Sequence, residues 1–98
     1  MRIPKNRHPS HPGEIIKKFI LDEFKISQTM LSERLNVSRR TINQLVNKQR
    51  PLSTIMALRL SKLTNTSPEY WINFQTAYDL FLIQNDKSLH LEKISAIA

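Results

Sequence analysis

Residues 27–47 read SQTMLSERLNVSRRTINQLVN, and this stretch decides the fold. Its apolar spacing predicts one helix over residues 28–35 and a second over residues 39–47. Ser27 and Ser38 stand where N-cap residues are expected, and the NVS between the two helices breaks the periodicity. Two short helices joined by a turn of about three or four residues are typical of a helix-turn-helix. The apolar residues expected to be buried in this motif are Met30, Leu31, Leu35, Val37, Ile42 and Leu45.

The second predicted helix has a polar face of unusual composition. The segment 38–50, SRRTINQLVNKQR, contains three arginines and a lysine but no acidic residue. At about 100° per residue, Ile42, Leu45 and Val46 share one side of this helix. The outward side then carries Arg40, Asn43, Gln44 and Asn47, with Arg39, Thr41 and Lys48 on its flanks.

These outward side chains match the chemistry of a DNA major groove. Arg can form two hydrogen bonds with guanine, and Asn and Gln can do the same with adenine. The first two turns of a recognition helix reach the base edges, and here they contain Arg39, Arg40, Thr41, Asn43 and Gln44. Phosphate contacts position a protein without reading sequence, and the residues placed for them are Gln28, Lys48 and Arg50.

The distribution of charge favours a nucleic acid over the alternative that this polar face is only hydrated surface. Residues 1–50 hold eleven Lys and Arg against four Asp and Glu, whereas residues 51–98 hold four of each. The whole net charge of +7 therefore lies in the first half, and basic surfaces attract polyanions by releasing counterions. The basic residues do not share one strongly amphipathic helix, so no membrane partner is expected.

Composition predicts an all-α protein of one DNA-binding domain. The chain has a single glycine and no strand-like alternation before its last ten residues. We expect a flexible basic arm over residues 1–10, a domain over 11–85 and a tail over 86–98. In that tail, LHLEKIS fits either a short strand or a helical turn. Cysteine is absent and no secretory or membrane-spanning segment is evident, so a cytoplasmic location is expected.

Three further helices bring the predicted number to five. They are expected over residues 13–24, 53–63 and 68–84, and SPE at residues 67–69 is a strong start signal for the last. Five of the seven aromatic residues lie between Tyr70 and Phe81. The residues expected to face the core are Ile15, Ile16, Phe19, Ile20, Ile55, Leu58, Leu60, Leu63, Trp71, Phe74, Tyr78 and Leu82.

The last helix is also apolar away from its core stripe. A helix that is apolar on a second side has to bury that side against a partner. Because a symmetric dimer suits a palindromic operator, we expect a two-fold homodimer. Its candidate interface residues are Ile72, Leu80 and Ile83, with help from Leu89 and Leu91 in the tail.

At this level of detail the chain resembles a known family. Residues 27–47 resemble the Xre/Cro-type helix-turn-helix of phage and bacterial repressors, which have a lambda-repressor-like fold. The flanking HPGEII (11–16), NKQRPLSTIMALRL (47–60) and TSPEYWINFQTAYDL (66–80) are similar to HigA (VapI-type) antitoxins, so the resemblance spans about seventy of the 98 residues. Members of this family neutralise a HigB toxin, an mRNA-cleaving protein of the RelE type, and repress their own operon as dimers.

The resemblance implies roles for individual residues. It implies backbone contact by Gln28 and phosphate contact near Ser53 and Thr54. The alternative function is a stand-alone repressor of the same fold with no toxin partner, and a third is a toxin-binding scaffold whose DNA contacts are incidental. The residues implied to contact bases are Ser38, Arg39, Arg40, Thr41, Asn43 and Gln44.

Two positions depart from the family pattern, and one pair of histidines is assigned no role in DNA binding. Asn36 and Lys48 stand where the family commonly has glycine, so Lys48 indicates either local strain or an added phosphate contact. His8 and His11 have the spacing of a metal pair without a third ligand nearby, and a hydrated surface or a helix cap at His11 is the better explanation. No paired carboxylates and no glycine-rich loop are present, so we expect no enzyme, cofactor or metal.

Overall fold

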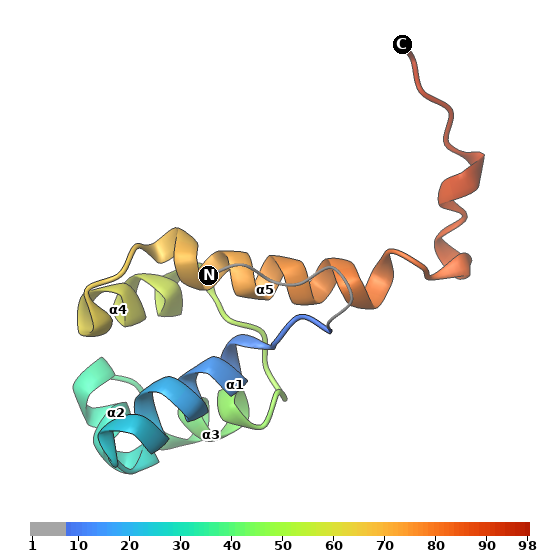
Figure 1. Cartoon of the computed structure of the whole chain (residues 1–98). Coiled ribbons are helices and arrows are strands. Elements are labelled where there is room, and N and C mark those ends of the chain that lie inside the picture. Colours follow the sequence, from blue (N-terminus) through green and yellow to red (C-terminus); the bar gives the residue numbers. More distant parts are fainter. Residues whose placement is uncertain (1–7) are drawn as a thin grey trace.

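The computed structural model describes residues 8–98, and every regular element in that range is helical (Figure 1). Residues 1–7 of the flexible basic arm expected over residues 1–10 lie outside the described part, and residues 8–10 are neither helix nor strand. The all-α, five-helix prediction is confirmed. The elements are α1 (Pro12–Ile16), which continues as the π-helix η1 (Lys17–Asp22), then α2 (Gln28–Leu35), α3 (Arg39–Val46), α4 (Thr54–Thr64), α5 (Pro68–Ile83) and the short 3-10 turns η2 (Lys87–Leu89) and η3 (Leu91–Lys93).

Side-chain caps begin all five α-helices. Ser27, Ser38, Ser53 and Ser67 each accept a hydrogen bond from the backbone N–H three residues further on, at 3.0–3.2 Å. Each cap satisfies one of the N–H groups that the first turn of a helix leaves without an internal partner. At α1 the cap is His11, whose Nδ1 accepts from the Gly13 N–H at 2.9 Å. The capping role considered for His11 is therefore confirmed.

The helices end largely without glycine. Asn36 and Asn65 adopt left-handed backbone angles, with φ of 57° and 55°. Asn tolerates this conformation because its short polar side chain can bond locally. Lys48 has φ of 59° and lacks that compensation, so the strain expected where the family has glycine is present, at a cost of about 1 kcal/mol.

The crossing of α2 and α3 is built on the apolar residues that the sequence pattern indicated. Leu31, Leu35, Ile42 and Leu45 are between 0 and 3% exposed, and Val37 packs against them. Together with residues of α1, α4 and α5 they form one core, in which Trp71 is the largest buried side chain. This crossing leaves the opposite side of α3 outside the core.

One prediction about the first helix is wrong. Phe19 was expected in the core, but it is 39% exposed, while Leu21 is buried instead. The reason is the π-helical geometry of η1, in which i→i+5 hydrogen bonding advances each residue by less than the 100° of an α-helix. Phe19 therefore turns away from the face of Ile15 and Ile16, and Leu21 turns toward it.

Four further residues predicted to be buried are exposed. Met30 lies off the side of α2 that carries Leu31 and Leu35 and is 45% exposed. On α4 the buried side is formed by Met56, Ala57 and Leu60, because this is the face that meets α5 and α2. The remaining wrong predictions are Ile55 and Leu58, which face away from that side of α4, and Leu82, which lies near the end of α5.

The end of α5 extends beyond the other helices, and the tail leads away from them (Figure 1). All residues from Leu80 onward are exposed. The molecule is accordingly elongated, measuring 49 × 25 × 23 Å along its principal axes. Of the two alternatives for LHLEKIS, the helical turn is the one observed, as η2 and η3. Within residues 8–98, no helix combines the length and the apolar character needed to cross a bilayer.

Candidate nucleic-acid interface

The outward face of α3 consists of polar and basic side chains. Arg39, Arg40 and Asn43 are exposed, and Thr41 and Gln44 are half-buried at its edge. Neither arginine takes part in an ion pair with any of residues 8–98. Because the buried Ile42 and Leu45 fix the rotation of the helix, these side chains point away from the core and remain accessible to a partner.

The beginning of α2 is connected directly to this face. The Asn43 side chain donates from Nδ2 to Oε1 of Gln28 at 3.3 Å. Gln28 is the first residue of α2, and Asn43 lies in the middle of α3. The residue predicted to contact the backbone therefore lies beside one predicted to contact bases, and the bond orients both amides.

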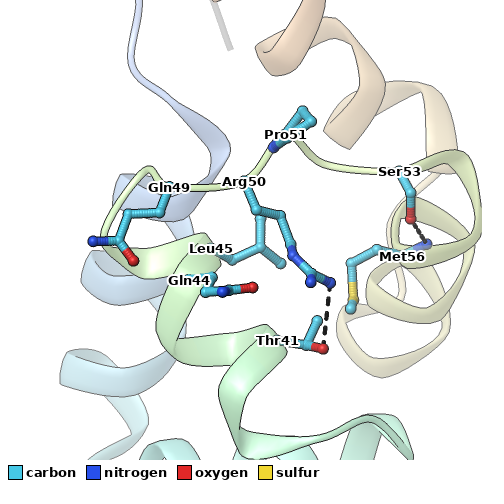
Figure 2. Close-up of a pocket in the computed structure, with 8 residues that line it drawn as sticks. All are labelled: Thr41, Gln44, Leu45, Gln49, Arg50, Pro51, Ser53 and Met56. Carbon is cyan, nitrogen blue, oxygen red and sulfur yellow. Dashed lines mark hydrogen bonds between the residues drawn. The ribbon is translucent and has the colours of Figure 1, made fainter.

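A second chain of hydrogen bonds fixes the first turn of α3. The Ser38 and Thr41 hydroxyl oxygens lie 2.9 Å apart, and the Arg50 guanidinium donates to the Thr41 hydroxyl at 3.3 Å. Figure 2 shows Arg50 reaching across from the α3–α4 loop to Thr41. This bond brings a residue predicted to contact phosphate next to the N-terminal turn of the recognition helix.

The α3–α4 loop and the start of α4 form an open hollow beside α3, lined by polar and apolar side chains. Its volume is about 370 Å³, and Figure 2 shows the residues that line it, Gln44 and Arg50 among them. Ser53 caps α4 at this edge, so the partial positive charge of the helix N-terminus adds to the charge of Arg50. Helix N-termini favour anions such as phosphate. The lining residues are Thr41, Gln44, Leu45, Gln49, Arg50, Pro51, Ser53 and Met56.

Lys48 was also predicted to contact phosphate, but it is not among the residues that line this hollow. Its ammonium lies 2.9 Å from Oε1 of Glu14 on α1, and both side chains are 47% exposed. The hydrogen bond and charge of Glu14 raise the pKa of the Lys48 ammonium. In the structure, Lys48 therefore connects the end of α3 to the start of α1, and a phosphate would compete with Glu14 for it.

Sequence reasoning missed several residues that shape this surface. The Arg59 guanidinium, on α4, donates to the backbone oxygens of Leu35 and Asn36 at 2.9 and 3.5 Å. It thereby satisfies carbonyl groups at the end of α2 and holds the turn that leads to α3. The sequence signal for this role of Arg59 was its position as a charged residue within the otherwise apolar run TIMALRL (54–60). Gln49 and Met56 were also missed, although both line the hollow beside Gln44.

The comparisons with known proteins agree with this geometry. The helix-turn-helix family HTH_3 matches residues 16–71, which include α2, α3 and α4 in full. The chain belongs to this helix-turn-helix family. The HTH_3 match runs from Ile16, just before the π-helix, to Trp71 in the first turn of α5. It therefore includes most of the residues of the hydrophobic core.

The resemblance to HigA antitoxins is confirmed by individual relatives of this HTH_3 chain. Antitoxin HigA-1 of Vibrio cholerae is 33% identical over 79 residues, which cover 81% of this chain and 74% of the relative. A solved structure described as Pseudomonas aeruginosa antitoxin HigA with the higBA promoter is 36% identical, with a TM-score of 0.82 over 92% of this chain and 99% of that one. The uncharacterized HTH-type transcriptional regulator YbaQ of Escherichia coli K12 is 36% identical over 80 residues, covering 82% of this chain and 71% of the relative.

Proposed function

We propose that this chain binds a palindromic operator in double-stranded DNA as a homodimer and represses the operon that encodes it. The observation that carries the proposal is the composition of α3. Its buried side is complete with Ile42 and Leu45, and its outward side presents Arg39, Arg40 and Asn43 with no acid nearby on the helix. Such a surface is suited to the major groove, where Arg and Asn read guanine and adenine.

The neighbouring elements support the same proposal. Gln28 at the start of α2 bonds to Asn43, and Ser53 at the start of α4 lines the hollow beside α3, so two helix N-termini lie next to α3. Phosphate groups on the two sides of a major groove would meet these N-termini and Arg50. The relative whose structure was solved with the higBA promoter has the same fold over nearly the whole chain.

Apolar residues near the end of α5 support the proposed homodimer. Leu80 and Ile83 are 54% and 50% exposed and lie on the side away from the core. Ile72 packs partly against its own core and offers the remainder of its side chain to a partner. Leu89 and Leu91 in the tail are also about half exposed. A two-fold pairing through these residues would present two copies of α3 to the two halves of an operator.

A footprint on the DNA upstream of the gene tests operator binding directly. We expect protection of two half-sites about one helical turn apart, because each α3 reads one major groove. The companion gel-shift uses about 150 mM salt and excess competitor DNA, since phosphate contacts alone give salt-sensitive binding to any sequence. Binding of equal strength to every sequence would contradict operator recognition and would favour the toxin-binding scaffold with incidental DNA contacts.

We further propose that the chain neutralises a HigB-like toxin, as the HigA resemblance implies. The test is the reading frame next to the gene: a small basic RelE-like protein should co-purify with this chain and lose its mRNA cleavage. If no such frame is present and no toxin co-purifies, the chain is a stand-alone repressor. The net charge of +7 favours that second function, because a basic toxin and a basic antitoxin repel each other.

A further inference from the structure

A second, apolar groove is lined by no residue of α3. It has a volume of about 630 Å³ and is formed by η1, the turn before α2 and the turn between α4 and α5. Phe24 and Phe19, two of its lining residues, are 68% and 39% exposed. Ile26, Leu63 and Tyr70 are among its other apolar lining residues. Operator binding through α3 makes no use of this groove, so its exposed aromatic rings need a different explanation.

The tail presents the opposite feature, apolar side chains with nothing to cover them. Leu89, Leu91, Ile94 and Ile97 are 47%, 49%, 72% and 105% exposed. They are spaced two or three residues apart over η2, η3 and the extended end of the chain. Burying the apolar side chains of such a segment is favourable, by about 25 cal/mol per Å² of apolar surface.

The groove and the tail lie at opposite ends of α5. Tyr70 and Trp71, which line the groove, are in the first turn of this 16-residue helix, and the tail begins after its last residue. At about 1.5 Å per residue the two ends are about 24 Å apart. The tail leads away from its own domain rather than back along α5 (Figure 1). A protomer therefore does not cover its groove with its own tail in this structure.

Two copies of the chain can place the tail of one near the α5 helix of the other. A two-fold axis perpendicular to α5 makes two such helices antiparallel. Pairing Ile72 with Ile83 of the other copy places Leu80 nearer the axis. In this arrangement the tail of each protomer begins near the first turn of the partner's α5, the turn that contributes Tyr70 and Trp71 to the groove. This step rests on the homodimer proposed above.

We propose that residues 86–98 of each protomer dock in the apolar groove of the partner. The area that a stable dimer needs supports this occupant, because standard interfaces use about 20–30 residues from each side. The exposed apolar side chains of α5 are Leu80, Phe81, Leu82, Ile83 and part of Ile72, which is far fewer. The tail supplies four more apolar side chains and the groove supplies the complementary surface. The chain would thus form a dimer in which the tail of each protomer occupies the groove of the other.

Disulfide trapping tests this arrangement, because the natural chain contains no cysteine. Full-length Phe24→Cys and Leu91→Cys proteins are mixed and oxidised, and the covalent species are identified by mass. We expect a mixed disulfide dimer, formed at least tenfold faster than when Leu91→Cys is mixed with Thr54→Cys. Thr54 is the matched control because it is exposed at the other end of α4 from the groove residue Leu63.

A second measurement keeps the proposal testable if oxidation is slow. Leu91→Asp should raise the dimer dissociation constant at least tenfold in sedimentation equilibrium, whereas Ser95→Asp, which adds the same charge to the tail, should change it less than threefold. A dimer that persists without the mixed disulfide, or equal dissociation constants for both variants, would overturn tail docking and leave the α5 dimer standing. A disulfide within one chain of the Phe24→Cys/Leu91→Cys double variant would also overturn it. A wild-type chain that is monomeric at all concentrations would refute the dimer and the docking together.

Discussion

Gly13 touches the backbone of Leu45 so closely that a methyl group added to Gly13 would lie 1.8 Å from the Leu45 carbonyl oxygen. The first turn of α1 therefore packs directly on the last turn of α3. Gly13 is the only glycine in the chain, and this is the position where the absence of a side chain is needed. The contact holds the end of α3 against α1.

Replacing Gly13 with Ala should destabilise the fold. The new methyl group would overlap backbone atoms of Leu45 and Val46, which cannot rotate away, so α1 would have to move off α3. We expect a loss of about 2–3 kcal/mol in the free energy of unfolding, measured by urea denaturation. Glu14→Ala at the neighbouring exposed position is the control and should cost less than about 1 kcal/mol. Equal losses in the two variants would contradict the close contact.

The left-handed backbone of Lys48 predicts an unusual order of stability. Lys48→Gly and Lys48→Ala both remove the ion pair with Glu14, so the two variants differ mainly in backbone preference. With φ of 59°, glycine should be the more stable of the two by about 1 kcal/mol. Thermal unfolding of the two proteins side by side measures this difference. If Ala were as stable as Gly, the end of α3 would have to adopt another conformation in solution.

Arg40 should carry base recognition within the proposed interface. Because its guanidinium is exposed on α3 and has no ion-pair partner among the described residues, Arg40→Ala should weaken operator binding by about 1–3 kcal/mol and relax the preference at one base position in each half-site. A binding assay over single-base operator variants measures both effects.

Lys48→Ala serves as the comparison for Arg40 in DNA binding. A lysine that contacts only phosphate should, when removed, weaken all sequences alike and reduce the salt slope by about one. Since Glu14 competes for the same ammonium, Glu14→Gln should act in the opposite direction and strengthen binding to all sequences. A base-specific effect of Lys48→Ala, or no effect of Glu14→Gln, would remove Lys48 from the phosphate contacts.

The cap at His11 predicts a dependence of stability on pH. Burial lowers the pKa of the His11 imidazole from its usual 6.5, and the charge of Lys48 adds to this, while Glu14 and Asp79 oppose it. The unfolded chain therefore takes up this proton before the folded chain does. Stability should be full above about pH 6.5 and fall as the pH drops toward the lowered value, by at most about 1.4 kcal/mol per pH unit.

Urea denaturation between pH 7.5 and pH 5.5 measures this slope, above the range in which carboxylates titrate. His11→Asn is the control, because Asn can cap α1 without titrating. The variant should show a flatter profile across this interval than the natural chain. An unchanged slope in His11→Asn would assign the effect to another group.

Much of this protein follows from local patterns in its sequence. The serine caps at Ser27, Ser38, Ser53 and Ser67 mark helix starts correctly, because a cap depends only on residues within the next turn. The rotation of α3 could also be predicted, since Ile42 and Leu45 are spaced at the period of an α-helix and both are buried. Once that side is assigned, the polar residues of the candidate interface are determined as well.

Other features depend on which helix packs on which, and no local pattern contains that information. Ile55 and Leu58 are as apolar as Met56 and Leu60, but only the packing of α4 against α5 and α2 decides which pair is buried. The π-helical turn that exposes Phe19 is likewise invisible in a sequence read with α-helical spacing. The sequence by itself determined the helices, their caps and the chemistry of α3. Only the tertiary structure decided that Lys48 pairs with Glu14 and that Arg50 reaches Thr41, because these contacts join residues on elements whose relative placement is set by the whole core.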